Sequence, residues 1–342
     1  MDDNLHKTDF GEFLDALSDV NHPFPPVLLR GASDLSKVQL KKLLPIWATL
    51  PSARRINFLE DLEELMEKDT LVSFDQLALA VLSDPEPKVR ILAIRLLWEC
   101  EDTHIIATIV DMMLEDPEEA VRAAAANFLG KFVYLGELES IADTHKISVV
   151  RNLLEVLASE ELPQVKQRAL ESLGYSSHPK IPSLITSALS SGETLWMSAA
   201  MAAISHSADE AWEPHVLAHL NHGDHEVQFE AVRAAGELEL TSALQPLAEM
   251  LENDTVDPEI RMAAIWSLSQ IGGDFARDLL HNLLNTTEDE DEIELIEAAL
   301  ENMETGIDPQ GFKMINFDPD EDENEEDYDF EEDDVDEVED FG

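Results

Sequence analysis

Histidines crowd one short stretch of the sequence. Five of them fall within twenty residues: His206, His215, His219, His222 and His225. His215 and His219 stand four residues apart, so a helix would place both imidazoles on one face, a spacing that can hold a metal ion. The alternative is the polar edge of a short helix whose apolar face supplies the core. No other segment offers matching ligands, so we favour the second interpretation and expect no cofactor.

The charge of the chain restricts its partners. The sequence has 74 Asp and Glu residues against 22 Lys and Arg, a net charge of −52. Residues 316–342 hold 17 of the acidic residues and no Lys or Arg, which leaves −35 on the rest. Such a field repels phosphate backbones, and no basic stripe interrupts it, so we expect no nucleic-acid partner. It favours a basic protein partner, although solubility alone would also explain it.

Compartment signals are few. Cys100 is the one cysteine, so it can form neither an internal disulfide nor a cysteine-based metal cluster, which fits a reducing compartment. The first residues are acidic and polar, unlike a secretory signal. No run of apolar residues approaches the length of a membrane span. We therefore expect a cytoplasmic protein with no membrane association.

A sequence repeat predicts the helices that position the histidines and charged residues. Its leading apolar residue recurs at intervals of 30 to 44 residues, at Val89, Val121, Val165, Leu195, Val227 and Ile260. An alanine follows each leading residue four positions later: Ala93, Ala125, Ala169, Ala199, Ala231 and Ala264. Helices that cross at short distance need small side chains at the contact. With an amphipathic stretch upstream of each copy, the pattern predicts an all-α stack of helix–turn–helix units.

The ends of the repeated helix have their own signals. Asp-Pro precedes three copies, at Asp84, Asp116 and Asp257. We expect each Asp to cap a helix and each Pro to occupy its first turn. Glycine stands near the end of three copies, at Gly130, Gly174 and Gly236, where we expect a left-handed C-terminal cap.

Departures from the unit set the expected domain boundaries. Residues 1–35 form a lead-in with a short amphipathic helix, and residues 36–73 form an atypical N-terminal helix pair. The regular repeats occupy 74–304. Residues 305–317 connect them to a disordered acidic tail at 318–342, because mutual repulsion should keep that segment extended.

The repeat resembles a known family. Asp-Pro-x-x-x-Val-Arg, followed by the alanine and a Leu-Gly type of ending, stands intact at 84–90 and 116–122 and is less complete in the later copies. This motif is similar to that of the HEAT-repeat superfamily, in the bacterial variety called phycobilisome-lyase HEAT-like repeats, over about residues 74–303. The resemblance implies a right-handed α-solenoid of stacked antiparallel helix pairs that binds other proteins.

The resemblance also implies an inter-repeat ladder, in which a basic residue of one second helix pairs with a turn carboxylate of a neighbouring unit. The basic candidates are Arg90, Arg122, Lys166 and Arg261. The acidic candidates are Asp84, Asp116 and Asp257. Trp196 and Gln228 replace the basic residue in two copies, so we expect the ladder to break in the middle. Trp196 then becomes a candidate partner contact, with partly buried packing as its alternative.

Some HEAT-type proteins are enzymes. Deoxyhypusine hydroxylase, a di-iron member, takes its ligands from several His-Glu pairs, whereas this chain has one, at His225-Glu226. One pair cannot ligate two irons, and no motif for chromophore attachment is evident. We therefore predict a non-catalytic interaction scaffold that binds a basic protein through an acidic concave surface, an acidic tail, or both. The alternative is a metal-dependent or chromophore-handling enzyme or lyase subunit centred on residues 206–226.

The acidic tail carries spaced aromatic residues, among them Tyr328, Phe330 and Phe341. Acidic segments of this kind can engage basic, partly apolar surfaces, so these three are candidate partner contacts. Two alternatives stay open for the tail: a solvating brush, or a segment that covers the protein's own basic side chains. A third function for the whole chain is unselective buffering of basic proteins.

Overall fold

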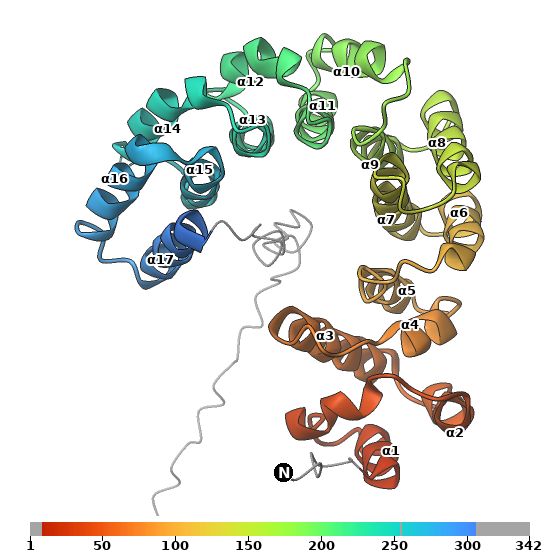
Figure 1. The fold of residues 1–342 in the computed structure, drawn as a ribbon. Helices are drawn as coiled ribbons and strands as arrows, with labels where there is room; N and C mark the ends of the chain where they lie inside the picture. Colours follow the sequence, from red (N-terminus) through yellow and green to blue (C-terminus); the bar gives the residue numbers. More distant parts are fainter. Residues whose placement is uncertain (1–8, 254, 306–342) are drawn as a thin grey trace, which may run out of the picture. The chain divides into compact units, whose positions relative to one another are not determined.

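The computed structural model describes residues 9–253 and 255–305. All regular structure in these residues is helical, which confirms the predicted α-solenoid (Figure 1). The described residues belong to one compact unit. The tail, with Tyr328, Phe330 and Phe341, lies outside the described residues, so the expectations for it stay predictions. No helix in the described ranges is long and apolar enough to cross a membrane.

Two short elements precede the repeats: α1 (Phe10–Ser18) and the 3₁₀ helix η1 (Pro26–Ala32). Antiparallel helix pairs follow, each with a first and a second helix. They are α2 (Lys37–Trp47) with α3 (Ser52–Lys68), α4 (Asp75–Val81) with α5 (Pro87–Arg95), α6 (Ile106–Glu115) with α7 (Glu119–Glu137), α8 (Asp143–Ala158) with α9 (Pro163–Leu173), α10 (Ile181–Leu189) with α11 (Thr194–His206), α12 (Glu213–His219) with α13 (His225–Glu237), α14 (Leu244–Leu251) with α15 (Pro258–Ile271), and α16 (Gly273–Leu284) with α17 (Glu290–Thr305). The 3₁₀ turns η2 (Thr103–Ile105), η3 (Glu210–Trp212) and η4 (Thr241–Ala243) lead into α6, α12 and α14.

The helices form two layers (Figure 1). From α3 onward, each second helix packs against the second helix of the next repeat, and each first helix packs on its own second helix. The six alanines of the repeat are all fully buried, which confirms their predicted role as small contact residues. Ala93, on α5, and Ala264, on α15, are examples near the two ends of the series. The core of each repeat is therefore continuous with that of its neighbours.

The prediction of left-handed glycine caps is wrong, although Gly174 does stand at the C-cap of α9. Gly130 lies inside α7, Gly236 lies in the last turn of α13, and Gly174 follows α9 with an ordinary φ of −52°. Each instead faces the next second helix at very short range. A Cβ atom at Gly174 would stand 2.6 Å from the Cα of Ala203, and one at Gly236 would stand 2.8 Å from the Cα of Ser267. These glycines are needed for close helix contact rather than for backbone freedom.

The Asp-Pro prediction holds at one of its three positions. Asp257 caps α15, with proline in the first turn. Helices α5 and α7 instead begin three residues after Asp84 and Asp116. There the Asp side chain accepts a hydrogen bond from the N–H two residues further on, at 2.9 and 3.0 Å. The two carboxylates shape the turn before the helix, and this places them toward the preceding repeat.

Some residues other than glycine adopt a left-handed backbone conformation, with a positive φ. Ala208, just after α11, has φ of 49°. Because an L-residue pays about 1 kcal/mol for that conformation, Ala208→Gly is expected to stabilise the protein by up to that amount in urea unfolding. Gly192, with φ of 74° and open space around it, is the matched control. Gly192→Ala should lower the unfolding midpoint, and a lower midpoint for Ala208→Gly would contradict the argument.

Candidate functional site

Some arginines of the second helices contact carboxylates of the following repeat. Arg90 makes a two-bond contact with Asp116, with Nε–Oδ2 at 2.8 Å and Nη2–Oδ1 at 2.7 Å. Both side chains are less than a tenth exposed. Among the described residues the same kind of contact joins three further pairs: Arg55–Asp84, Arg122–Glu161 and Arg261–Glu292. We call each such pair a rung.

A rung arginine also holds its own turn. Arg90 donates from Nη1 to the carbonyl of Asp84 at 2.8 Å, and Arg122 donates in the same way to the carbonyl of Asp116 at 2.8 Å. Arg261 donates to the carbonyl of Leu251 at 2.7 Å. One guanidinium thus satisfies a backbone acceptor of its own repeat and a carboxylate of the next.

The structure pairs the candidate ladder residues differently from the sequence expectation. Arg122 contacts Glu161, which precedes α9, and Arg261 contacts Glu292, which lies in the first turn of α17. Neither helix has an Asp-Pro start. Asp257 faces a histidine instead of an arginine. The charge of Lys166 contributes to lowering the pKa of Glu161, the carboxylate that Arg122 contacts. The N–H of Leu162 and the Arg122 guanidinium outweigh partial burial and lower the pKa of Glu161.

Sequence reasoning missed the first rung. Arg55 belongs to the atypical N-terminal pair, and its Nη1 lies 2.7 and 2.6 Å from the two carboxylate oxygens of Asp84. Trp47 donates from Nε1 to the same carboxylate at 2.8 Å. Asp84 is 6% exposed as a residue, so this cluster lies in the core. The repeat motif flagged Asp84 but gave no signal for Arg55, because that residue lies outside the repeated pattern.

In the repeat of α13, two residues share the contacts that one arginine makes elsewhere. One bonds a backbone carbonyl of its own repeat, and the other contacts a carboxylate of the next repeat. Gln228 stands at the arginine position and donates from Nε2 to the carbonyl of Leu220 at 3.0 Å. His225 takes the carboxylate contact: its Nε2 lies 3.2 Å from Oδ1 of Asp257 and 3.2 Å from Oε2 of Glu259. Partial burial opposes protonation, but these acidic neighbours outweigh it and raise the pKa of His225.

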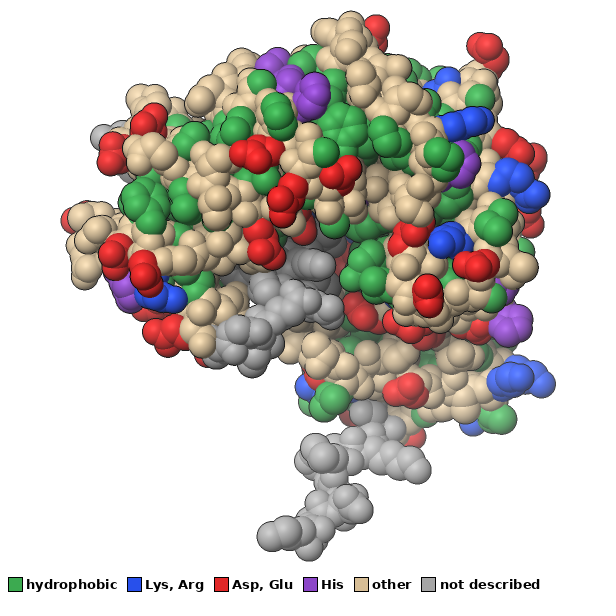
Figure 2. All heavy atoms as spheres, turned by 45° about the horizontal axis from the view of Figure 1, so that its top comes forward, with side chains coloured by type: hydrophobic (Ala, Val, Ile, Leu, Met, Phe, Trp, Pro, Cys, Tyr) green, Lys and Arg blue, Asp and Glu red, His purple; other side chains and the backbone are tan. Residues whose placement is uncertain are grey.

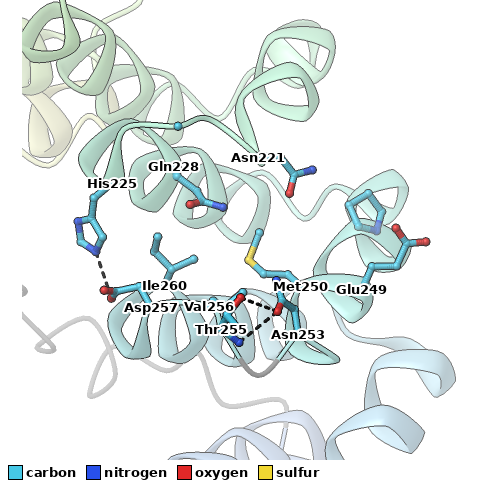
Figure 3. Close-up of a pocket in the computed structure, with 12 residues that line it drawn as sticks. Asn221, His225, Gln228, Glu249, Met250, Asn253, Thr255, Val256, Asp257 and Ile260 are labelled. Atoms are coloured by element: carbon cyan, nitrogen blue, oxygen red, sulfur yellow. Dashed lines mark hydrogen bonds and ion pairs between the residues drawn. The ribbon is translucent and has the colours of Figure 1, made fainter.

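A pocket of about 430 Å³ adjoins this cluster. Figure 3 shows Asn221 and Gln228 on one side of it and Asn253 and Thr255 on the other, with His225 and Asp257 joined at one end. Most of these groups are polar and uncharged. The pocket can therefore admit water or a small polar ligand next to the histidine and its two carboxylates.

The other histidines do not share a site. His219 directs Nδ1 to the carbonyl of His215 on its own helix, at 2.7 Å. His206 stacks on Tyr175 with ring centroids 4.1 Å apart, and its Nδ1 lies 3.0 Å from the carbonyl of Glu171. In the described ranges, one group of three potential ligands converges, and it contains His225 rather than the i,i+4 pair.

Trp196, the candidate partner contact within the described residues, is half-buried in the first turn of α11. Two other tryptophans, Trp212 and Trp266, have the same intermediate exposure. Trp212 packs beside His215, with ring centroids 5.5 Å apart. Partly buried packing therefore describes all three side chains, and the role of Trp196 in binding a partner stays a prediction.

The fold and its rungs define an α-solenoid built from nearest-neighbour contacts. Residues 75–143 and 213–301 match the family model for HEAT repeats. These two segments of the chain are therefore HEAT repeats. The two matched segments contain both partners of the rungs Arg90–Asp116 and Arg261–Glu292. The predicted cytoplasmic location and domain boundaries stay predictions.

Comparison with solved structures returned matches at low sequence identity. A complex of CpcE and CpcF of phycocyanin lyase from Nostoc is 18% identical, covering 67% of this chain and 94% of that one, with a TM-score of 0.44. YibA of Escherichia coli is 20% identical, covering 81% and 96%, with a TM-score of 0.40. Human deoxyhypusine hydroxylase in complex with glycerol is 15% identical, covering 86% and 97%, with a TM-score of 0.35. A search of curated proteins returned no match.

Proposed function

We propose that this protein is a non-catalytic scaffold that binds a basic protein partner. The HEAT-repeat stack supplies an extended surface of helices that depends on local contacts only, the architecture by which such proteins bind others. Carboxylates are spread over the face shown in Figure 2, and Lys and Arg side chains are fewer there. The charge excess of the sequence supports a partner of opposite sign.

One helix carries the observation that supports this proposal best. The last helix of the stack, α17, buries Ile296 and Ala299 against its neighbours. Its exposed side repeats glutamate at alternating spacings of four and three residues, which forms a continuous stripe: Glu290, Glu294, Glu297, Glu301 and Glu304. Like charges at these spacings destabilise an isolated helix. A basic partner would relieve that repulsion, so we take this stripe as the docking surface.

The test compares two triple variants that remove equal charge. A fluorescent, lysine-rich helical peptide is titrated into the full chain. Glu290→Gln/Glu294→Gln/Glu297→Gln should weaken binding roughly tenfold, because three exposed ion pairs together contribute about 1.5 kcal/mol. The control is Asp111→Asn/Glu115→Gln/Glu118→Gln, at exposed carboxylates around α6. It should leave the affinity nearly unchanged.

The dependence of the affinity on salt distinguishes electrostatic binding from other modes of binding. Raising ionic strength from about 0.05 to about 0.5 M should weaken wild-type binding strongly, because the Debye length shortens. Affinity that ignores salt would exclude an electrostatic mode of binding. Equal weakening of both triple variants would reject the stripe and support unselective attraction by total charge.

A further inference from the structure

We propose that His225, Asp257 and Glu259 bind a divalent transition-metal ion of the zinc type. Each residue offers one ligand atom, and the three atoms lie within 4.8 Å of one another. The histidine nitrogen is 3.2 Å from an oxygen of each carboxylate. A tetrahedral ion with ligands at about 2.05 Å needs its ligand atoms about 3.3 Å apart. Two of the three separations thus match, and the third is no more than 4.8 Å, so small side-chain adjustments would complete the geometry.

Charge balance supports a cation at this place. In the rung of Arg90 and Asp116, one guanidinium meets one carboxylate. Here the imidazole of His225 contacts both Asp257 and Glu259, and Glu226 adds a third carboxylate 3.7 Å from Nδ1. The contact to Asp257 that an arginine would make in a rung is thus made by a histidine. A bound divalent ion would add positive charge beside these carboxylates.

Two helix starts hold the ligands in place. His225 is the first residue of α13, whose cap Asp224 accepts a hydrogen bond from the N–H of Val227 at 3.3 Å. Asp257 is the cap of α15 and accepts the N–H of Glu259 at 3.0 Å. The ligands therefore come from matching ends of two successive second helices, and packing of α13 on α15 sets their separation.

The surroundings resemble those of an open metal site. Metal-binding histidines usually direct their other ring nitrogen to a carboxylate or carbonyl, and Glu226 lies near Nδ1 of His225. Three protein ligands leave a coordination position for water or another molecule. The pocket lined by Asn221, Gln228 and Thr255 adjoins the cluster and gives access to that position (Figure 3). The same pocket could hold a small polar ligand of the metal.

In the experiment, zinc chloride is titrated into the full chain. Binding is measured by calorimetry and by NMR of ¹⁵N-labelled histidine rings. Wild-type protein should show one site that is tighter than the weak binding to its many carboxylates. The ring nitrogens of one histidine should shift at substoichiometric zinc. His225→Ala and Glu259→Gln should each lower the affinity of this site at least tenfold. Asp257 is left intact because it caps α15.

Matched controls are available nearby. His215→Ala removes an exposed histidine of α12, and Glu249→Gln removes a carboxylate that lines the same pocket. Both should keep the tight site. Unchanged affinity in His225→Ala and Glu259→Gln would overturn the proposal, as would equal shifts of all histidine rings. Circular dichroism of each variant excludes loss of fold as the cause, and none of these readouts depends on the binding of a basic partner.

Discussion

Replacing Gly174 by alanine is expected to lower the free energy of unfolding by about 3 kcal/mol. The added Cβ would lie 2.6 Å from the Cα and 2.9 Å from the carbonyl carbon of Ala203. Both atoms belong to the backbone of α11, which cannot rotate away as a flexible side chain could. Helices α9 and α11 would have to separate, and the buried alanines between them would lose their contacts. Urea unfolding of the two proteins measures the effect.

Gly223→Ala is the matched control for that substitution. No heavy atom lies within 4 Å of a Cβ built at Gly223, and its backbone is not in the left-handed region. The control should therefore be neutral or slightly stabilising, because alanine reduces the freedom of the unfolded chain. Equal stability of Gly174→Ala and Gly223→Ala would show that α9 and α11 do not approach as closely as the structure indicates.

Asp84→Ala is expected to destabilise the protein by about 4 kcal/mol. The substitution leaves the guanidinium of Arg55, whose side chain is 10% exposed, without its carboxylate. It also removes the acceptor of the Trp47 indole N–H and of the Glu86 N–H. An uncompensated charge in the core costs far more than the pair contributes when intact. Thermal and urea unfolding would both report the loss.

Two further variants test the reason for that loss. The double variant Arg55→Ala/Asp84→Ala should be less destabilised than the sum of the two single variants, because it removes both charges together. Glu64→Gln breaks an exposed ion pair with Lys68 and should change stability by less than about 0.5 kcal/mol. Additive single and double variants would mean that the Arg55–Asp84 contact is not the source of the effect.

The part of the fold that could be predicted from the sequence is the part that follows from its periodicity. The recurring apolar residue and the alanine four positions later follow from helix geometry, so Ala125 and Ala231 could be assigned to buried contacts without a structure. The glycines were harder, because a glycine permits both a left-handed turn and a close contact. Only the position of the neighbouring helix decides between them, as Gly174 against Ala203 shows.

The candidate site shows the same limit. Arg122 was visible in the motif, but its partner Glu161 lies in an irregular turn that no pattern identifies. His225 and Asp257, in contrast, are 32 residues apart, close to the repeat period, and therefore occupy matching places in successive repeats. The sequence contained that signal. The sequence pattern instead favoured His215 and His219, which are four residues apart. That spacing can be interpreted from a single helix, whereas the proximity of His225 and Asp257 depends on how two repeats stack.

The rungs have a direction along the chain. The arginine always comes first, and its carboxylate follows 29, 26, 39 or 31 residues later, for Arg55, Arg90, Arg122 and Arg261 respectively. During synthesis on the ribosome, each rung arginine therefore emerges before the carboxylate that it will contact. Its guanidinium stays unpaired until the following repeat has been synthesised. Shortened versions of the protein should accordingly stop after a carboxylate-bearing turn. A cut just behind one of these arginines would leave its guanidinium at the new edge without the carboxylate that it contacts in the full chain.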